Sequence, residues 1–297
     1  MLTCLCACYG CASLAPQQWS VGIYTGKEPL DLASAAGAPN PVLTAADVTD
    51  VSAEFVADPF MVRDKDKWYM FFEVMNQKTR HGDIGLATSG DGLHWTYDRI
   101  VLDEPFHLSY PCVFGFEDRY YMVPETYQAD GVRLYRADEF PGKWSFVSTL
   151  VAGSWLDPTV FRHGDWWWMF ACKGNTMLHL FYSDRPEGPW KEHPKSPVIR
   201  GDLRTARPGG RVLAMEGRIV RFAQDDFPSY GSRVRAFEIT RLTATDYEER
   251  EIAVNTVLGA SGSGWNADGM HHIDAHRLDD GGWIACVDGW HRRTARP

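Results

Sequence analysis

The chain has 297 residues, a formal net charge of −9 and a hydrophobic content of 44%. The acidic balance and the lack of a long basic run exclude a typical nucleic-acid-binding protein. No apolar stretch reaches about 18 residues, so the sequence predicts no membrane-spanning helix. Aromatic residues make up 13% of the chain and include 12 Trp, a composition that suits broad β-sheet packing.

The start of the chain differs in composition from the rest. Four of the seven cysteines lie there, at Cys4, Cys6, Cys8 and Cys11, and the other three are scattered. This spacing is not a disulfide framework. No basic residue precedes the short apolar run, so it is a poor signal peptide. We therefore expect residues 1–18 to form a disordered leader, residues 19–297 to form a single domain, and the protein to be cytoplasmic.

The first clear structural pattern is a β-hairpin that begins at Asp58. An apolar run from Pro59 to Val62 is followed by a charged turn and then by an aromatic run that ends at Glu73. Proline is tolerated at the first residue of a strand, where its missing N–H does no damage. The two ends of a hairpin lie on the same side. The pattern therefore predicts a hairpin with a carboxylate at each open end.

This hairpin pattern recurs along the chain. The five copies begin at Asp58, Tyr110, Asp157, Arg207 and His272. A third strand follows in each of the first four copies, and after three of them a Trp marks the start of an outer strand. Hairpin repeats about 50 residues apart are typical of propeller blades. The sequence therefore predicts an all-β fold, a five-bladed β-propeller with four-stranded antiparallel blades.

The fifth repeat lacks outer strands of its own, because it ends soon after its second strand near Trp290. The natural donor is the strand expected at residues 19–24, which would pair with the last blade. Such an N-terminal strand closes the ring and removes exposed sheet edges. A β-sandwich is the alternative architecture, but it explains the hairpins without explaining the recurring Asp-Pro or Tyr-Pro starts.

In a propeller the first strand of each blade lines the central channel, so all five starts should share one face. The second strands end on that face too. The residues expected there are Asp58, Glu73, Tyr110, Glu125, Asp157, Arg207 and His272. Further planar or charged groups suited to binding hydroxyls, carboxylates or phosphates are Arg221, Gln224, Asp225, Tyr230 and Asp274. Such a ring predicts a site for a polar ligand.

A dense cluster of His and Asp opens the fifth repeat. Alternation along a strand would place His272, Asp274 and His276 on one face. A divalent metal near His272, hydrogen bonding to a substrate and a structural role all remain open. We expect no other cofactor.

Several segments together resemble a known family. They are residues 57–62, 71–73, 106–111, 124–125, 206–208, 221–225, 230–231 and 269–274. This set resembles the N-terminal domain of plant glucosamine inositolphosphorylceramide transferases and its free-standing bacterial relatives. The likeness runs from about Trp19 to Trp290. It implies a carbohydrate-related propeller rather than the transferase activity itself.

The architecture is also similar, more distantly, to the arabinanase, invertase and levansucrase superfamily of five-bladed propellers. That likeness implies catalytic acids at the start of the first and third blades, which match Asp58 and Asp157. The superfamily keeps a glutamic acid at the start of the fourth blade, where this chain has Arg207. Because Arg207 stands in place of that glutamic acid, the likeness to this superfamily does not indicate which residue donates the proton.

The leading hypothesis is a glycoside hydrolase, because glycosidic cleavage needs one protonated and one ionised carboxyl group beside the bond. Asp58 is the candidate base or nucleophile, Glu125 the acid, and Glu73 its reserve. Asp157 would orient the substrate or tune the acid. The predicted substrate-binding residues are Tyr110, Arg207, Arg221, Gln224, Asp225, Tyr230, His272 and Asp274, and Arg207 suggests an anionic sugar.

Two other functions compete with this hypothesis. The first is a non-catalytic propeller that binds a carbohydrate or glycoconjugate and partners a separate glycosyltransferase. The second is a metal-assisted enzyme that uses His272 and Asp274.

Overall fold

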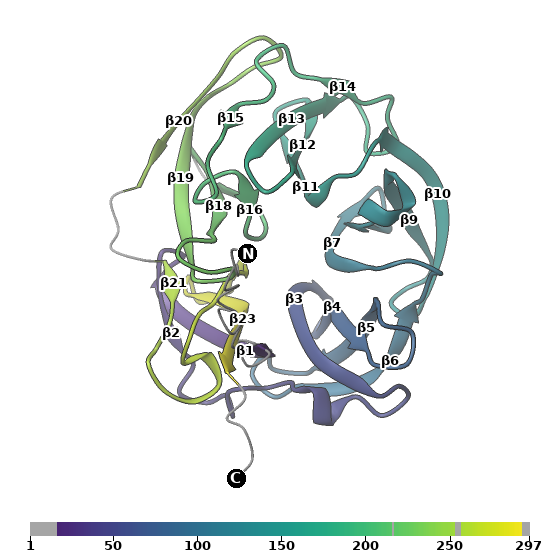
Figure 1. Ribbon diagram of the computed structural model, residues 1–297, viewed down its shortest axis with the longest axis vertical. Coiled ribbons are helices and arrows are strands. Elements are labelled where there is room, and N and C mark those ends of the chain that lie inside the picture. The colour runs from purple at the N-terminus through teal and green to yellow at the C-terminus, as the bar shows by residue number, and fades with distance from the viewer. Residues whose placement is uncertain (1–16, 216, 253–256, 293–297) are drawn as a thin grey trace, which may run out of the picture.

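Five antiparallel sheets are arranged radially around a central axis in the computed structural model (Figure 1), which describes residues 17–215, 217–252 and 257–292. The only helical elements in these ranges are three short 3₁₀ turns, η1 (Ala45–Asp47), η2 (Tyr127–Ala129) and η3 (Gly264–Asn266). The predicted all-β, five-bladed propeller is therefore confirmed. We number the blades in chain order.

Blades 1 and 2 each contain four strands that follow one another in the chain, from the channel outward. Blade 1 consists of β3 (Ala53–Asp64), β4 (Lys67–Asn76), β5 (Gly82–Ser89) and β6 (Thr96–Leu102). Blade 2 consists of β7 (Ser109–Phe116), β8 (Arg119–Glu125), β9 (Gly131–Glu139) and β10 (Lys143–Ala152). Aromatic side chains pack between them, because Trp144 of β10 meets the Phe71 ring of β4 edge-on, with centroids 5.4 Å apart.

Blades 3 and 4 keep this order and add short strands at their edges. Blade 3 consists of β11 (Leu156–His163), β12 (Trp166–Lys173), β13 (Met177–Ser183), β14 (Lys191–Glu192) and β15 (Ile199–Arg200). Blade 4 consists of β16 (Arg207–Pro208), β17 (Leu213–Met215), β18 (Arg218–Asp225), β19 (Arg233–Leu242), β20 (Tyr247–Glu251) and β21 (Leu258–Gly259). The inner strand of blade 4 is interrupted, since β16 and β17 both pair with β18.

Blade 5 joins the two ends of the chain. It consists of β22 (Ile273–Arg277), β23 (Trp283–Arg292), β1 (Gln17–Glu28) and β2 (Asp31–Ser34). The antiparallel pairing of β1 with β23 runs from Gln17 opposite Arg292 to Gly26 opposite Trp283. Closure of the ring by the N-terminal strand is confirmed. β1 begins within the range predicted to be a leader, and residues 1–16 of that range lie outside the described residues.

The two faces of the ring differ in what they carry. The inner strands β3, β7, β11 and β16 approach the channel from one face, which we call the mouth. The hairpin turns that join first and second strands lie on the opposite face. The mouth carries the predicted site residues, so the propeller fold positions the site.

Gly210, at the break in the inner strand of blade 4, is a point of close backbone approach. It forms a parallel bridge with Ile273 of blade 5, and its N–H donates to the Tyr110 hydroxyl at 2.7 Å. A Cβ atom added there would lie 1.8 Å from the Ile273 carbonyl oxygen, and its φ of +130° disfavours other residues.

Gly210→Ala is therefore expected to lower the free energy of unfolding by about 2–3 kcal/mol. Urea denaturation monitored by Trp fluorescence measures the change. Gly142→Ala is the matched control, because Gly142 lies in an exposed turn with open space around its Cα. Equal stabilities of the two variants would contradict the close approach.

Candidate functional site

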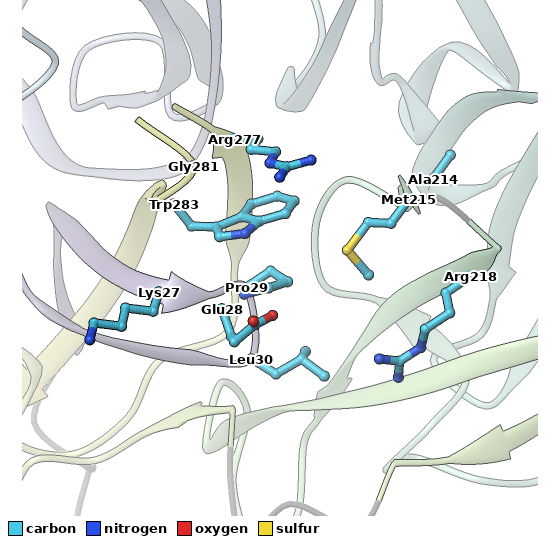
Figure 2. A pocket seen from close by; sticks show the side chains of 10 residues that line it. All are labelled: Lys27, Glu28, Pro29, Leu30, Ala214, Met215, Arg218, Arg277, Gly281 and Trp283. Carbon is cyan, nitrogen blue, oxygen red and sulfur yellow. The ribbon is translucent and has the colours of Figure 1, made fainter. Parts of the chain in front are cut away.

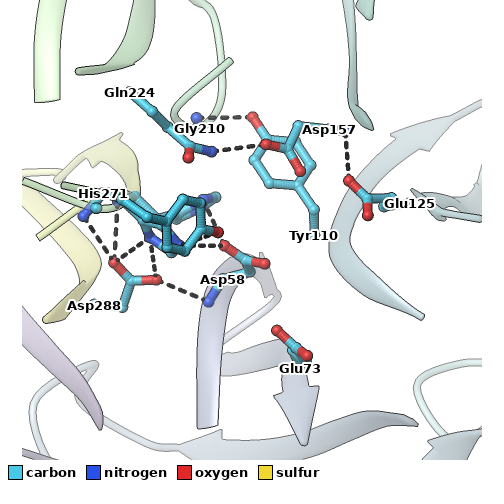
Figure 3. A network of polar contacts seen from close by, with 12 residues as sticks. Asp58, Glu73, Tyr110, Glu125, Asp157, Gly210, Gln224, His271 and Asp288 are labelled. Carbon is cyan, nitrogen blue, oxygen red and sulfur yellow. Dashed lines mark hydrogen bonds and ion pairs between the residues drawn. The ribbon is translucent and has the colours of Figure 1, made fainter. Parts of the chain in front are cut away.

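Most of the predicted site residues meet at the mouth (Figure 3). Asp58, Glu73, Tyr110, Glu125 and Asp157 are all buried there, with exposed fractions of 5% or less. Arg207, Gln224, Tyr230 and His272 contact members of this ring. Buried carboxyl groups at such density need partners or protons, because an isolated charge in a protein interior is costly.

Three residues at the starts of inner strands share an unusual backbone. Asp58, Tyr110 and Asp157 have φ values of +52°, +47° and +48°, and each precedes a proline. The strand register shifts at the same place in each of the three blades. Positive φ is uncommon in residues other than glycine and persists only where the surroundings impose it.

Acids from neighbouring blades hold two of these strained residues. The N–H of Asp58 donates to Asp288 Oδ2 at 3.0 Å, and the N–H of Asp157 donates to Glu125 Oε2 at 3.0 Å. In both cases the acceptor stands at the mouth end of the second strand of the preceding blade. Each of these two hydrogen bonds therefore links one blade to the next.

Glu73 holds the equivalent place at the end of the second strand of blade 1. The corresponding hydrogen bond between blades 1 and 2 is absent, since no hydrogen bond joins Glu73 to Tyr110 in the described residues. The nearest polar partner of Glu73 is His107, whose Nε2 lies 3.6 Å from Glu73 Oε1. The N–H of Gly82 donates to His107 Nδ1 at 2.9 Å, so the proton of this neutral imidazole is on Nε2 and faces Glu73. Burial lowers the pKa of His107 to about 4.

Asp157 is held as a carboxylate by cations and amides. Arg207 Nε donates to Asp157 Oδ2 at 2.5 Å, and Gln224 Nε2 donates to the same oxygen at 2.7 Å. Burial alone would raise the pKa of Asp157, but the Arg207 guanidinium outweighs it and the net shift is downward. Arg207 thus forms an internal ion pair, and its predicted contact with a sugar stays a prediction.

The other carboxyl groups of the ring are held toward the protonated form. Burial raises the pKa of Glu125 well above its usual range, and the neighbouring Asp157 charge adds to the effect. Burial likewise raises the pKa of Glu73, with the charges of Asp58 and Glu125 as further causes. The pair Glu125 and Asp157 thus divides into one acid and one carboxylate.

Asp58 lies between these extremes. Burial, with help from Asp157 and Asp288, raises its pKa to about 7, although the His271 cation opposes the shift. Its Oδ1 has no hydrogen-bond partner in the described residues; His271 Nε2 and His272 Nδ1 lie 3.8 and 3.9 Å away. Asp58 therefore presents a free oxygen that can take up a proton near neutral pH.

Sequence reasoning missed Asp288 and the role of His271. His271 Nδ1 donates to Asp288 at 2.9 Å, and its Nε2 lies 3.0 Å from the Tyr230 hydroxyl. Burial would lower the pKa of His271, but the Asp288 charge raises it to about 9. Asp288 could have been found from the repeat, because it lies on the second strand of the fifth hairpin opposite the start of the first strand, as Glu73 and Glu125 do in theirs.

His272 is fully buried, and neither of its ring nitrogens has a hydrogen-bond partner in the described chain. The rings of Phe60 and Tyr110 pack edge-on against it, and burial lowers its pKa to about 4, so it is neutral. Of the three residues predicted to share a face, Asp274 and His276 are in contact, with His276 Nε2 3.1 Å from Asp274 Oδ2, and Asp274 also pairs with Arg211.

Metal ligation is better met elsewhere at the mouth. Asp58, His271 and Asp288 offer three ligand atoms within 4.8 Å of one another. In this arrangement, however, the Nδ1 of His271 is engaged with Asp288 and its Nε2 with Tyr230. The geometry fits a proton on each nitrogen better than a metal.

Arg221 and Asp225 serve the packing of blade 4 instead of the ring. The Arg221 guanidinium makes two hydrogen bonds with Glu249, at 2.5 and 2.6 Å, and is 2% exposed. Asp225 pairs with Arg233 and Arg235 of the adjacent strand β19. Their predicted contact with substrate finds no support in this arrangement.

The five-bladed propeller fold is similar to the folds of solved glycosidases. A putative glycosidase from Bacteroides thetaiotaomicron has 12% sequence identity and a TM-score of 0.65, covering 88% of this chain and 97% of its own. The catalytic domain of a Coprinopsis cinerea GH62 α-L-arabinofuranosidase has 15% identity and a TM-score of 0.59, over 75% and 77% of the two chains. These likenesses concern the fold.

The chain belongs to the family of the N-terminal domain of glucosamine inositolphosphorylceramide transferase 1, whose profile matches residues 11–290. It is 38% identical to the transferase of that name from Oryza sativa subsp. japonica and 34% identical to that from Arabidopsis thaliana. Both matches cover 94% of this chain but only 41% and 40% of the relatives. No helix in the described residues is long and apolar enough to cross a bilayer.

Proposed function

We propose that the mouth binds a carbohydrate and cleaves a glycosidic bond. The observation that carries the proposal is the pairing, in one hairpin, of Asp58 with Glu73. Asp58 has a free oxygen and a pKa of about 7, and Glu73 is buried, has a pKa that burial raises well above its usual range, and has no hydrogen-bond partner in the described residues. Glycoside hydrolysis needs such a base or nucleophile and such an acid.

Glu73 suits the role of proton donor better than Glu125, the acid expected from the sequence. Glu125 already accepts the Asp157 N–H, and its side chain is hydrogen-bonded to the Asp157 carboxylate. Its proton is therefore directed into the protein. Glu73 has no such partner in the described residues, and the His107 N–H lies 3.6 Å from its carboxyl group. Asp157 and Glu125 then act as positioning residues.

The remaining ring residues are proposed to hold the sugar. Gln224 Oε1 and both nitrogens of His272 are buried and have no hydrogen-bond partner in the described chain, so each has unused hydrogen-bonding capacity. Tyr230 is 38% exposed and lies over the ring edge, with the Arg207 guanidinium 5.3 Å from its ring centroid.

A panel of aryl glycosides, including glucosaminides, glucuronides and arabinofuranosides, tests the proposal on wild type, Asp58→Asn, Glu73→Gln and Glu125→Gln. The first two variants should lose at least about 100-fold in kcat/KM, since each removes a group acting on the transferred proton. Asp165→Asn, in an exposed hairpin turn on the opposite face, should retain wild-type activity. Unchanged activity in both Asp58→Asn and Glu73→Gln would remove the assignment.

A second candidate function is a non-catalytic glycan-binding domain of a transferase. The observation in its favour is Arg207, whose ion pair with Asp157 occupies the start of blade 4. The chain also spans only about two fifths of the relatives named as transferases. Glycan binding without turnover of any panel member, unaffected by Glu73→Gln, would favour this function.

A further inference from the structure

A second cavity lies on the face opposite the mouth, between blades 4 and 5. Its volume is about 640 Å³, within the range typical of small-molecule sites. Three turns converge on it: the β1–β2 turn, the β17–β18 hairpin and the β22–β23 turn. Its lining residues include Trp283, Arg277, Arg218, Glu28, Met215 and Leu30 (Figure 2).

Trp283 gives this cavity an aromatic wall. It stands directly opposite Arg277 in the β22–β23 register, and it packs against the apolar cluster between blades 4 and 5. Within the described part of the chain, no ring stacks on it, no cation lies over it and its indole N–H has no acceptor. Figure 2 shows its ring facing the space bounded by Met215 and Leu30.

Most of the charged residues that line the cavity make no strong ion pair with a described residue. Arg277 is exposed and makes no ion pair with any described residue. Arg218 lies 3.6 Å from Glu238, too far for a strong hydrogen bond, and its side chain is 46% exposed. Glu28 is the only acid among the described residues that line the cavity, and no described cation pairs with it. The described lining residues carry three cations, Lys27, Arg218 and Arg277, and one carboxylate, so this lining is locally positive on a chain of net charge −9.

We propose that this cavity binds a sugar that carries a phosphate or a carboxylate. The apolar face of the sugar ring would stack on Trp283, Arg277 and Arg218 would hold the anionic group, and Glu28 would accept a hydroxyl hydrogen bond. Arginine is suited to such anions because its planar fork donates two parallel hydrogen bonds. The site is separate from the mouth and does not depend on the function proposed there.

Isothermal titration calorimetry of the full chain at low ionic strength tests the proposal with four probes: glucose 1-phosphate, glucuronate, glucose and inorganic phosphate. At least one anionic sugar should bind at least tenfold more tightly than glucose and inorganic phosphate, and the stronger of the two identifies the anion. Arg277→Ala and Trp283→Leu should each weaken that binding at least tenfold, whereas Arg99→Ala, an exposed cation on β6, should not.

Asp58→Asn separates this site from the mouth, because binding at the opposite face should survive it unchanged. Binding that Asp58→Asn abolishes and Arg277→Ala leaves intact would belong to the mouth and would overturn the proposal. The absence of binding by both anionic sugars would overturn it as well. Thermal melting of each variant confirms that the fold is retained, and Arg218→Ala supplies a second test should Trp283→Leu unfold.

Discussion

Replacing Arg207 with methionine is expected to lower the free energy of unfolding by about 3–5 kcal/mol at pH 7. The size follows from removing one partner of a buried ion pair, which leaves the other charge uncompensated. Asp157 is 1% exposed, and Arg207 provides its cation at hydrogen-bonding distance. Gln224 would still donate a hydrogen bond to Asp157, but the Asp157 carboxylate would have no cationic partner in Arg207 and would still lie beside Glu125.

The loss should shrink as the pH falls. In the wild type the pKa of Asp157 is lowered, so its stabilising contribution is present above its unfolded value, near 3.8, and is lost in acid. Without Arg207, burial would raise that pKa, the folded state would bind the extra proton, and stability would rise as the pH falls. The difference between variant and wild type is therefore largest at neutral pH and smallest below about pH 4.

Urea denaturation at pH 7 and pH 4 measures the loss of stability in Arg207→Met and its dependence on pH. Arg241→Met is the control, since its exposed pair with Glu248, 3.5 Å apart, should contribute less than about 1 kcal/mol. An equal loss at the two pH values would show that Arg207 acts through packing on the Tyr230 ring instead of through its charge.

Asp288→Asn is expected to have a similar effect, again about 3–5 kcal/mol, and to change the titration of His271. The Asp288 carboxylate accepts the backbone N–H groups of Asp58, His271 and His272 at 3.0, 3.2 and 3.0 Å, as well as His271 Nδ1. An asparagine keeps one acceptor oxygen and turns an NH₂ group toward N–H donors. Buried donors would then be left unpaired at the strained start of blade 1.

The pH dependence of stability distinguishes the electrostatic role of Asp288 from a role in packing alone. The pKa of His271 is raised to about 9, so its contribution to stability is complete below its unfolded value of 6.5 and is lost as the pH rises through 9. In Asp288→Asn, burial should bring that pKa below 6.5, and the stability change between pH 6.5 and 9 should disappear.

NMR titration of the His271 ring and denaturation between pH 6 and 10 report the two effects. Asp279→Asn is the matched control, because Asp279 is exposed and pairs only with Arg63 at 2.8 Å. A His271 pKa that stays near 9 in Asp288→Asn would mean that another group supplies its charge partner.

Local patterns in the sequence determined the architecture of this protein. Hairpins with a proline after the first residue start at Asp58, Tyr110, Asp157 and Arg207, 47 to 52 residues apart, and a fifth hairpin without the proline starts 65 residues later. This repeat identifies the blades and their inner strands. The missing outer strands of the fifth repeat predict the closing strand β1. Asp58, Tyr110 and Asp157 could be placed at the mouth for the same reason, since the period brings equivalent positions to equivalent places.

Only the tertiary structure decided how these side chains are used. Arg207 and Gln224 bind Asp157, Asp288 holds Asp58, and His107 faces Glu73. These partners come from adjacent blades or loops. His107 has no proline or repeat signal to mark it, and Arg221 and Asp225 carry suitable groups but turn toward partners within blade 4. Strand spacing is a local property that the chain encodes directly, whereas ion pairs and pKa values depend on which distant groups share a buried space.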